Sequence, residues 1–216
     1  MFTELVDLVL PRRCLGCGVA GAGLCDGCLD PVPARREPSP APPGLPECWS
    51  AGAYTGVLRD AVIAYKERGL TALAPPLGEA LAYTVATALP HEHHRALLVP
   101  VPSSARARRG RGHDHVTGLA TLAVRRLGAG ARVCGGLAHA RRVADQAGLS
   151  ATERAANLAG SLRVTKALRG RPVPPVVLVD DILTTGATLA EAARALREGG
   201  ISPRIAVTVA ATRRRS

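Results

Sequence analysis

The chain has 216 residues, of which 47% are hydrophobic and only 2% aromatic, and it carries a formal net charge of +11. This length suits one globular domain with a small appendage, and a core built from Ala, Val and Leu suits strands covered by helices on both faces, which indicates the α/β class. The basic charge is compatible with an acidic or phosphorylated partner, but the scarcity of aromatics removes the stacking platforms that single-strand nucleic-acid binders commonly use.

The first predicted element is a short amphipathic helix at the start of the chain. Phe2, Leu5, Val6 and Val9 recur at helical spacing, and Pro11 ends the pattern. Acidic residues interrupt this apolar stretch and no basic segment precedes it, so it does not resemble a secretory signal. No apolar run in the chain approaches the length of a membrane span. We therefore expect a cytoplasmic protein without membrane insertion, in which closely spaced cysteines bind metal rather than form disulfides.

Two C-x₂-C pairs follow this helix, with seven residues between them. The four cysteines are Cys14, Cys17, Cys25 and Cys28. Each pair places two thiolates on one ion, so together they predict a tetrahedral, structural Zn²⁺ site, with a redox pair or an iron cluster as the alternatives. Because four sulfurs leave no open coordination position, we expect the metal to fold a segment that is too small to form its own core.

Residues 31–46 are rich in Pro and show no hydrophobic periodicity, which is typical of a semi-rigid linker. The sequence therefore predicts three parts. They are an N-terminal helix with a zinc-binding module (1–30), a Pro-rich linker (31–46) and one larger domain (47–216).

Strands and helices alternate beyond the linker, which predicts βαβ units and a parallel sheet. In chain order we expect a strand at 49–54, helices at 57–66 and 73–89, a strand at 96–102, a basic loop at 103–112 and a helix at 115–127. A connection follows over 141–157. The last unit comprises a strand at 176–179, a loop at 180–185, a helix at 188–198 and a strand at 205–210.

Residues 176–188 carry the strongest functional signal. Four apolar residues form a strand, and Asp180 and Asp181 follow at its carboxyl end, where open parallel sheets bind ligands. Small and hydroxyl-bearing residues then lead into a helix, namely Thr184, Thr185, Gly186, Ala187 and Thr188. Free backbone N–H groups at that helix start suit a phosphate monoester, and the two carboxylates suit two vicinal ribose hydroxyls. An ordinary turn with Asp and Thr as helix caps is the alternative.

The whole string resembles the 5-phosphoribosyl-1-pyrophosphate motif of type I phosphoribosyltransferases. This resemblance implies a parallel sheet flanked by helices, a phosphoribosyl-pyrophosphate ligand and Mg²⁺ to neutralise the departing pyrophosphate. It also implies a pyrophosphate loop after an earlier strand, for which the chain offers the basic loop at 103–112. The candidate groups are Ser103, Arg106, Arg109 and Arg111, because guanidinium groups bind phosphate oxygens in pairs. A solvated basic loop is the alternative. Asp180 and Asp181 are the candidate catalytic residues, with Asp181 either a base or a ribose ligand.

The order of motifs along nearly the whole chain is similar to that of the ComF family, the competence-associated phosphoribosyltransferase-like proteins. The shared features are the cysteine module, the V-P-V-P strand at 99–102, the final phosphoribosyl loop, and the residues Arg142, Gln146, Glu153, Arg154 and Asn157. The family's R-G-F-N-Q segment departs here, because it reads Arg111-Gly112-His113-Asp114-His115. The resemblance implies a role in DNA uptake, with single-stranded DNA and DNA-uptake proteins as partners.

Two functions therefore remain open from the sequence. One is a Mg²⁺-dependent transfer of the phosphoribosyl group to or from an unidentified acceptor, and the other is a binding module without catalysis. His113 and His115 are acid/base candidates or, with Asp114, caps of the following helix. Lys66 and Arg68 are either phosphate contacts or part of a solvated face. The basic charge has a second explanation too, because nearly all basic residues are Arg in a chain rich in Ala, Gly and Pro.

Overall fold

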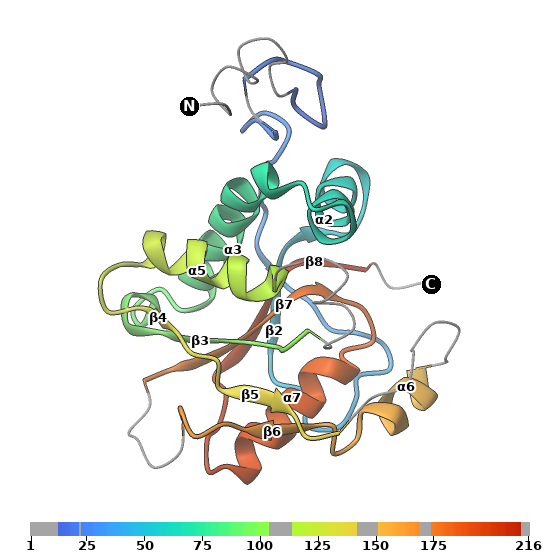
Figure 1. Ribbon diagram of the computed structural model, residues 1–216, viewed down its shortest axis with the longest axis vertical. Coiled ribbons are helices and arrows are strands. Elements are labelled where there is room, and N and C mark those ends of the chain that lie inside the picture. The colour runs from blue at the N-terminus through green and yellow to red at the C-terminus, as the bar shows by residue number, and fades with distance from the viewer. Residues whose placement is uncertain (1–12, 22, 104–113, 142–150, 169–173, 213–216) are drawn as a thin grey trace.

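The computed structural model describes residues 13–21, 23–103, 114–141, 151–168 and 174–212. Its centre is a six-stranded sheet in the order β1-β2-β8-β7-β3-β4 (Figure 1). The strands are β1 (Ala34–Arg35), β2 (Cys48–Ala53), β3 (Leu97–Pro100), β4 (Arg132–Val133), β7 (Val176–Leu183) and β8 (Ile205–Ala211). β1 runs antiparallel to β2, and every other neighbouring pair in this sheet is parallel. The predicted α/β class with a mostly parallel sheet is confirmed.

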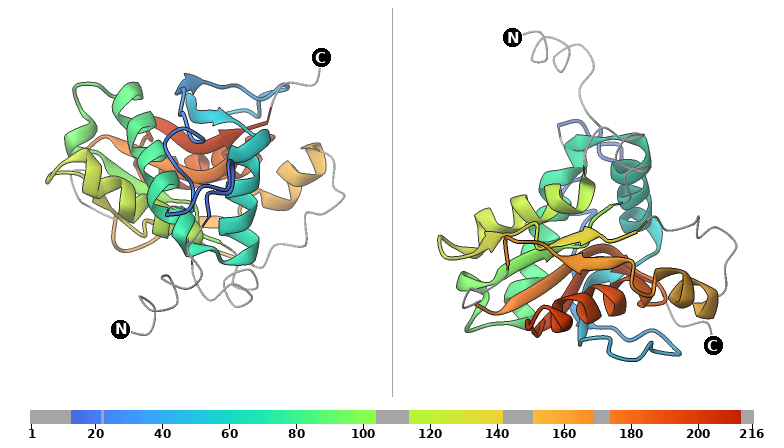
Figure 2. Two further views of the ribbon diagram at one scale, coloured as in Figure 1. Left: turned by 90° about the horizontal axis from the view of Figure 1, so that it is seen from above. Right: turned by 60° about the horizontal axis from the view of Figure 1, so that its bottom comes forward.

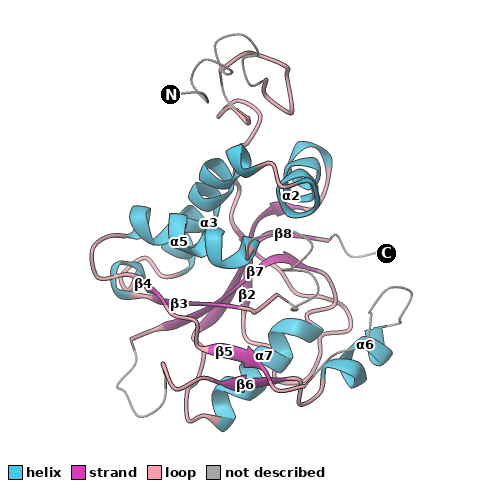
Figure 3. Cartoon of the chain, in the orientation of Figure 1, coloured by secondary structure: helices cyan, strands magenta, loops and turns pink. Residues whose placement is uncertain are grey.

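Helices cover both faces of the sheet (Figures 1 and 3). One face packs against α2 (Gly56–Arg68), α3 (Ala74–Ala88) and α5 (His115–Leu127). The other packs against α7 (Ala187–Glu198) and an antiparallel hairpin of β5 (Leu137–His139) and β6 (Leu162–Val164). In the described part of the chain, the remaining elements are α6 (Ala151–Leu158) and two 3₁₀ turns, Thr71–Leu73 and His93–Arg95. No helix in the described part of the chain combines the length and apolar character needed to cross a membrane.

The apolar run in β7 is buried on both sides. Val177 and Val179 belong to the core beneath α2, α3 and α5, whereas Val176 and Leu178 belong to the core beneath α7. This alternation is the pleat of a strand that has helices on both faces, and it explains why the run contains no polar residue.

β7 does not end where the sequence suggests. The expected loop at 180–185 is wrong in its first four residues, because Asp180 and Asp181 lie within the strand, which continues to Leu183. Parallel pairing with β8 persists to the contact of Leu183 with Ala211 and holds the two acids in extended backbone. The acids are thereby fixed by the sheet rather than by a loop.

Most other expected elements lie within about two residues of the observed ones, but several short elements were not expected. Residues 31–46 contribute β1, which pairs with β2 through Ala34–Ser50 and Arg35–Trp49. The connection at 141–157 contains most of α6, and the β5–β6 hairpin precedes and follows it. These elements are too short to show a periodic pattern.

The cysteine segment packs on the helical face formed by α2 and α3 (Figure 2). Cys14 and Leu24 are buried in the same core as Leu73, at 3% and 4% exposure. Gly23 lies so close to this surface that an added Cβ would sit 3.4 Å from the Cβ of Ala72. The segment therefore shares a core with the larger domain.

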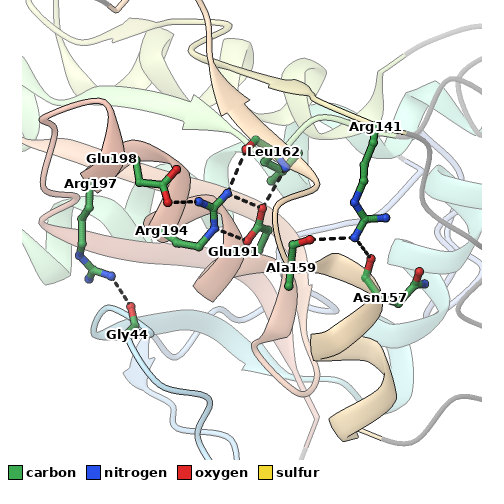
Figure 4. A network of polar contacts seen from close by, with 9 residues as sticks. All are labelled: Gly44, Arg141, Asn157, Ala159, Leu162, Glu191, Arg194, Arg197 and Glu198. Carbon is green, nitrogen blue, oxygen red and sulfur yellow. Dashed lines mark hydrogen bonds and ion pairs between the residues drawn. The ribbon is translucent and has the colours of Figure 1, made fainter.

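A polar network joins α7 to the β5–β6 hairpin (Figure 4). Glu191 is buried, and its Oε1 accepts a hydrogen bond of 2.9 Å from the backbone N–H of Leu162. Arg194 donates from Nε to Glu191 Oε2 at 2.6 Å, donates from Nη2 to the Leu162 carbonyl at 3.1 Å, and also pairs with Glu198. One carboxylate thus serves both the hairpin and the helix.

Replacing Glu191 by Ala is expected to lower the free energy of unfolding by about 2–3 kcal/mol, because it leaves a buried backbone N–H without an acceptor and removes an ion pair. Chemical denaturation of the variant measures this loss. Glu198→Ala, which removes the exposed partner of the same arginine, serves as the control and should cost less than about 1 kcal/mol. Equal losses in the two variants would contradict the role assigned to Glu191.

Candidate functional site

The topology of the sheet has a switch point between β3 and β7. These strands are parallel neighbours, but the chain leaves β3 towards α5 on one face and leaves β7 towards α7 on the other. Such a switch point opens a crevice at the carboxyl ends of the two strands, where α/β sheets bind ligands. Ser103, Asp180, Asp181 and residues 184–188 all lie at these strand ends.

Asp181 is the centre of a buried cluster of charges. Its side chain is 7% exposed, and its Oδ2 lies 2.6 Å from Lys66 Nζ and 2.9 Å from His115 Nε2. Burial alone would raise the pKa of this carboxyl, but the hydrogen bond from His115 and the charge of Lys66 outweigh it and hold the pKa well below its usual range. Asp181 is therefore ionised, and α2, α5 and β7 each supply one member of the cluster.

His115 also links Asp181 to the end of β3. Since a carboxylate only accepts, His115 Nε2 donates its hydrogen bond to Asp181. The other ring nitrogen, Nδ1, lies 3.4 Å from Ser103 Oγ. Ser103 Oγ donates in turn to Asp114 Oδ1 at 3.4 Å, and the same oxygen caps α5 by accepting from the Thr117 N–H at 3.2 Å. The capping role that the sequence allowed for this region therefore belongs to Asp114, and His115 serves the site.

Asp180 has a different environment from its neighbour. Within the described residues no cation lies at ion-pairing distance from its carboxyl, which accepts a hydrogen bond of 2.9 Å from the Asp181 N–H. Burial, reinforced by the negative charge of Asp181, raises the pKa of Asp180 to about 8. Two adjacent acids thus differ in charge near neutral pH, and Asp180 is the one that a bound cation would most readily ionise.

This shift predicts a pH-dependent stability. Between about pH 5 and pH 8 the folded state keeps the Asp180 proton that the unfolded chain has released, so the free energy of unfolding falls as pH rises, by at most about 1.4 kcal/mol per pH unit. Asp181 is ionised in both states over this range and adds no slope.

Asp180→Asn removes this contribution. Denaturation at several pH values measures the free energy of unfolding of the variant minus that of the parent protein. This difference is expected to grow from pH 5 to pH 8 and to level off above pH 8. A difference that does not change with pH would contradict the raised pKa of Asp180.

Residues 184–188 form the turn from β7 into α7. Gly186 precedes the helix with φ of +74°, a left-handed conformation that favours glycine, and Ala187 N–H faces Thr185 Oγ1 at 3.4 Å. The first backbone N–H groups of α7 have no partner within the helix, so the turn offers donors and a positive helix end to an anion.

The structure brings together only part of the predicted set. Asp180, Asp181, Ser103 and the turn from Thr184 to Thr188 lie at the crevice, whereas Arg106, Arg109, Arg111 and His113 lie outside the described residues. Lys66 and His115, for each of which the sequence left two roles open, are the direct partners of Asp181. No local pattern predicts these contacts, because Lys66 and His115 precede Asp181 by 115 and 66 positions in the sequence. They reach it only through the fold.

The four cysteines also converge. The sulfurs of Cys14, Cys17, Cys25 and Cys28 all lie within 4.8 Å of one another. Cys25 Sγ is 3.5 Å from Cys14 Sγ and 3.7 Å from Cys17 Sγ, close to the spacing of about 3.8 Å that tetrahedral Zn–S bonds of about 2.3 Å require. Backbone N–H groups of Cys17 and Cys25 lower the pKa of the Cys14 thiol to about 6, which favours a thiolate ligand. The cluster can therefore hold zinc.

Comparison with known proteins agrees with the geometry of the crevice. The family model described as "phosphoribosyl transferase domain" matches residues 104–216, just over half of the chain and including Asp180 and the turn into α7. No curated protein matches the chain.

Proposed function

Because the chain belongs to the phosphoribosyl transferase domain family, we propose that it binds phosphoribosyl pyrophosphate with Mg²⁺ at the crevice and transfers the phosphoribosyl group to or from an acceptor. The observation that carries this proposal is the juxtaposition of Asp180 and Asp181 with the start of α7. Two carboxylates suit the ribose hydroxyls, and the backbone N–H groups at the start of α7 suit the 5-phosphate.

Lys66 and His115 act as positioning residues in this proposal. Both contact Asp181 Oδ2, which keeps the carboxylate ionised and holds it in one orientation. Through Ser103, His115 also connects Asp181 to the strand that leads into residues 104–113, where the arginines proposed for pyrophosphate lie. Among the described residues, this link reaches as far as Ser103 at the end of β3.

The carboxylates also fit Mg²⁺, which prefers oxygen ligands, and Asp180 is the acid that lacks a protein cation among the described residues. When bound with the substrate, the ion neutralises charge on the departing pyrophosphate. In the reaction, the bond from C1 of the ribose to pyrophosphate oxygen breaks, the acceptor nucleophile bonds to C1, and a base accepts the proton that the acceptor loses.

The experiment that tests transfer follows pyrophosphate release from phosphoribosyl pyrophosphate and Mg²⁺ with a panel of nucleobases and amines. Release that requires both an acceptor and the acids at positions 180 and 181 supports a transferase. Saturable binding without release for any acceptor overturns the transfer step and leaves a binding module.

The closer resemblance to ComF, the cytoplasmic location and the partners in DNA uptake stay predictions from the sequence. An affinity for single-stranded DNA that does not fall with salt would contradict the DNA prediction.

A further inference from the structure

The carboxyl end of β3 is held by side chains from both faces of the sheet. Val101 N–H still donates to β7, but Pro102 has no N–H with which to continue this pairing. From one face, Asp114 at the start of α5 accepts a hydrogen bond of 3.4 Å from Ser103 Oγ. From the other face, His139 of the β5–β6 hairpin contacts the Pro102 carbonyl. Side chains therefore take over the positioning of the strand end where the backbone pairing stops.

His139 makes its contact from the last position of β5. Its Nε2 lies 3.1 Å from the carbonyl oxygen of Pro102, and because a carbonyl only accepts, Nε2 carries the hydrogen and donates it. His139 shares a face of β5 with Leu137, which lies two residues earlier and is buried in the same core as Val101. The pleat of the hairpin therefore directs His139 towards the end of β3.

The hairpin that carries His139 is fixed to α7. Leu162 lies directly opposite His139 in the antiparallel register, and its N–H donates to Glu191 Oε1 at 2.9 Å (Figure 4). Next to this pair, the Ala140 N–H donates to the Ser161 carbonyl at 2.7 Å. Glu191 lies about one turn after the start of α7. The same rung of the hairpin thus contacts α7 through one strand and the end of β3 through the other.

This rung connects the two phosphate ends of the proposed site. The start of α7 is the proposed place for the 5-phosphate, and the chain that follows β3 is the proposed place for the pyrophosphate. A ligand that carries both groups binds best when the two places are already at the right separation, because no binding free energy is then lost in ordering them. The contacts of His139 and Glu191 with opposite strands of the hairpin maintain this separation.

We propose that His139 is a positioning residue, which holds the end of β3 at a set distance from α7 and so prepares the site for the pyrophosphate of the ligand. This inference rests on the proposed function, because the proposed function assigns the pyrophosphate to the chain after β3. His139 acts through the Pro102 carbonyl and needs no contact with the ligand. Its loss should therefore weaken the binding of the pyrophosphate and leave that of the ribose and the 5-phosphate.

The test compares phosphoribosyl pyrophosphate with ribose 5-phosphate, which lacks the pyrophosphate, by calorimetric titration in Mg²⁺. His139→Leu, which removes the donor, is expected to weaken phosphoribosyl-pyrophosphate binding about tenfold and ribose 5-phosphate binding less than about twofold. His139→Gln, whose amide N–H can donate to the Pro102 carbonyl, should retain the parent affinity for both.

Thr165→Val is the matched control. It removes the hydrogen bond of 2.9 Å from Thr165 Oγ1 to the Gly135 carbonyl, at the opposite end of the hairpin from His139. Both affinities are expected to stay at the parent values in this variant, and thermal melting verifies that all three variants fold.

Three results would overturn the inference and leave the proposed function standing. They are an unchanged affinity for phosphoribosyl pyrophosphate in His139→Leu, an equal loss for the two ligands in that variant, and a loss in His139→Gln as large as in His139→Leu. A parent protein that binds neither ligand gives a different result, because it overturns the proposed function itself and the role of His139 with it.

Discussion

Replacing Asp180 and Asp181 together by Asn is expected to reduce the affinity for phosphoribosyl pyrophosphate by about a hundredfold to ten-thousandfold. Each carboxylate is proposed to accept a hydrogen bond from a ribose hydroxyl, and a hydrogen bond to a charged group contributes about 1.5–3 kcal/mol. Calorimetric titration in Mg²⁺ measures the loss. Asp60→Asn, which removes the same charge from an exposed position on α2, is the matched control and should bind as the parent protein does.

The single variants separate binding from stability. Asp181→Asn removes the partner of Lys66 and His115, so we expect it to lower the free energy of unfolding by about 2 kcal/mol as well as the affinity. Asp180→Asn should weaken binding without this loss, because its raised pKa shows that the folded protein does not favour its charge. Unchanged affinity in the double variant would remove both residues from the site.

Removal of zinc is expected to have the second large effect. The cysteine segment contributes Cys14 and Leu24 to the core beside Leu73, so loss of the metal should expose this surface and lower the free energy of unfolding by about 3 kcal/mol or more. Metal analysis of protein purified without chelators should find about one zinc per chain. Thermal melting before and after chelation measures the loss of stability.

Cys17→Ser tests the same cluster without a chelator. It should lose the zinc and show the lower melting temperature, whereas Cys134→Ser, outside the cluster, should keep both the metal and the melting temperature. Protein that contains no zinc when purified, or that melts at the same temperature after chelation, would contradict a structural zinc site.

The sequence predicts the larger elements well because each has a strong pattern. The four apolar residues before Asp180 can only be a strand buried on both faces, and α5 begins and ends where its apolar spacing begins and ends. The end of β7 was misplaced because two acids are unusual inside a strand. Here their positions are fixed by pairing with β8, a partner that follows them in the chain and that local preference does not reveal.

The site could be predicted only in part for a related reason. Asp180, Asp181 and the turn into α7 are adjacent in sequence, so their pattern is visible. Lys66 and His115 reach Asp181 only after α2 and α5 pack on one face of the sheet. Contacts between distant segments decide these residues.

Calorimetric titration of the intact protein with phosphoribosyl pyrophosphate, in the presence and absence of Mg²⁺, tests the central claim most directly. The proposed site predicts saturable binding of one molecule per chain that is strengthened by Mg²⁺ and lost in the double Asn variant. Absence of binding at millimolar ligand, or binding that persists unchanged in that variant, would contradict it.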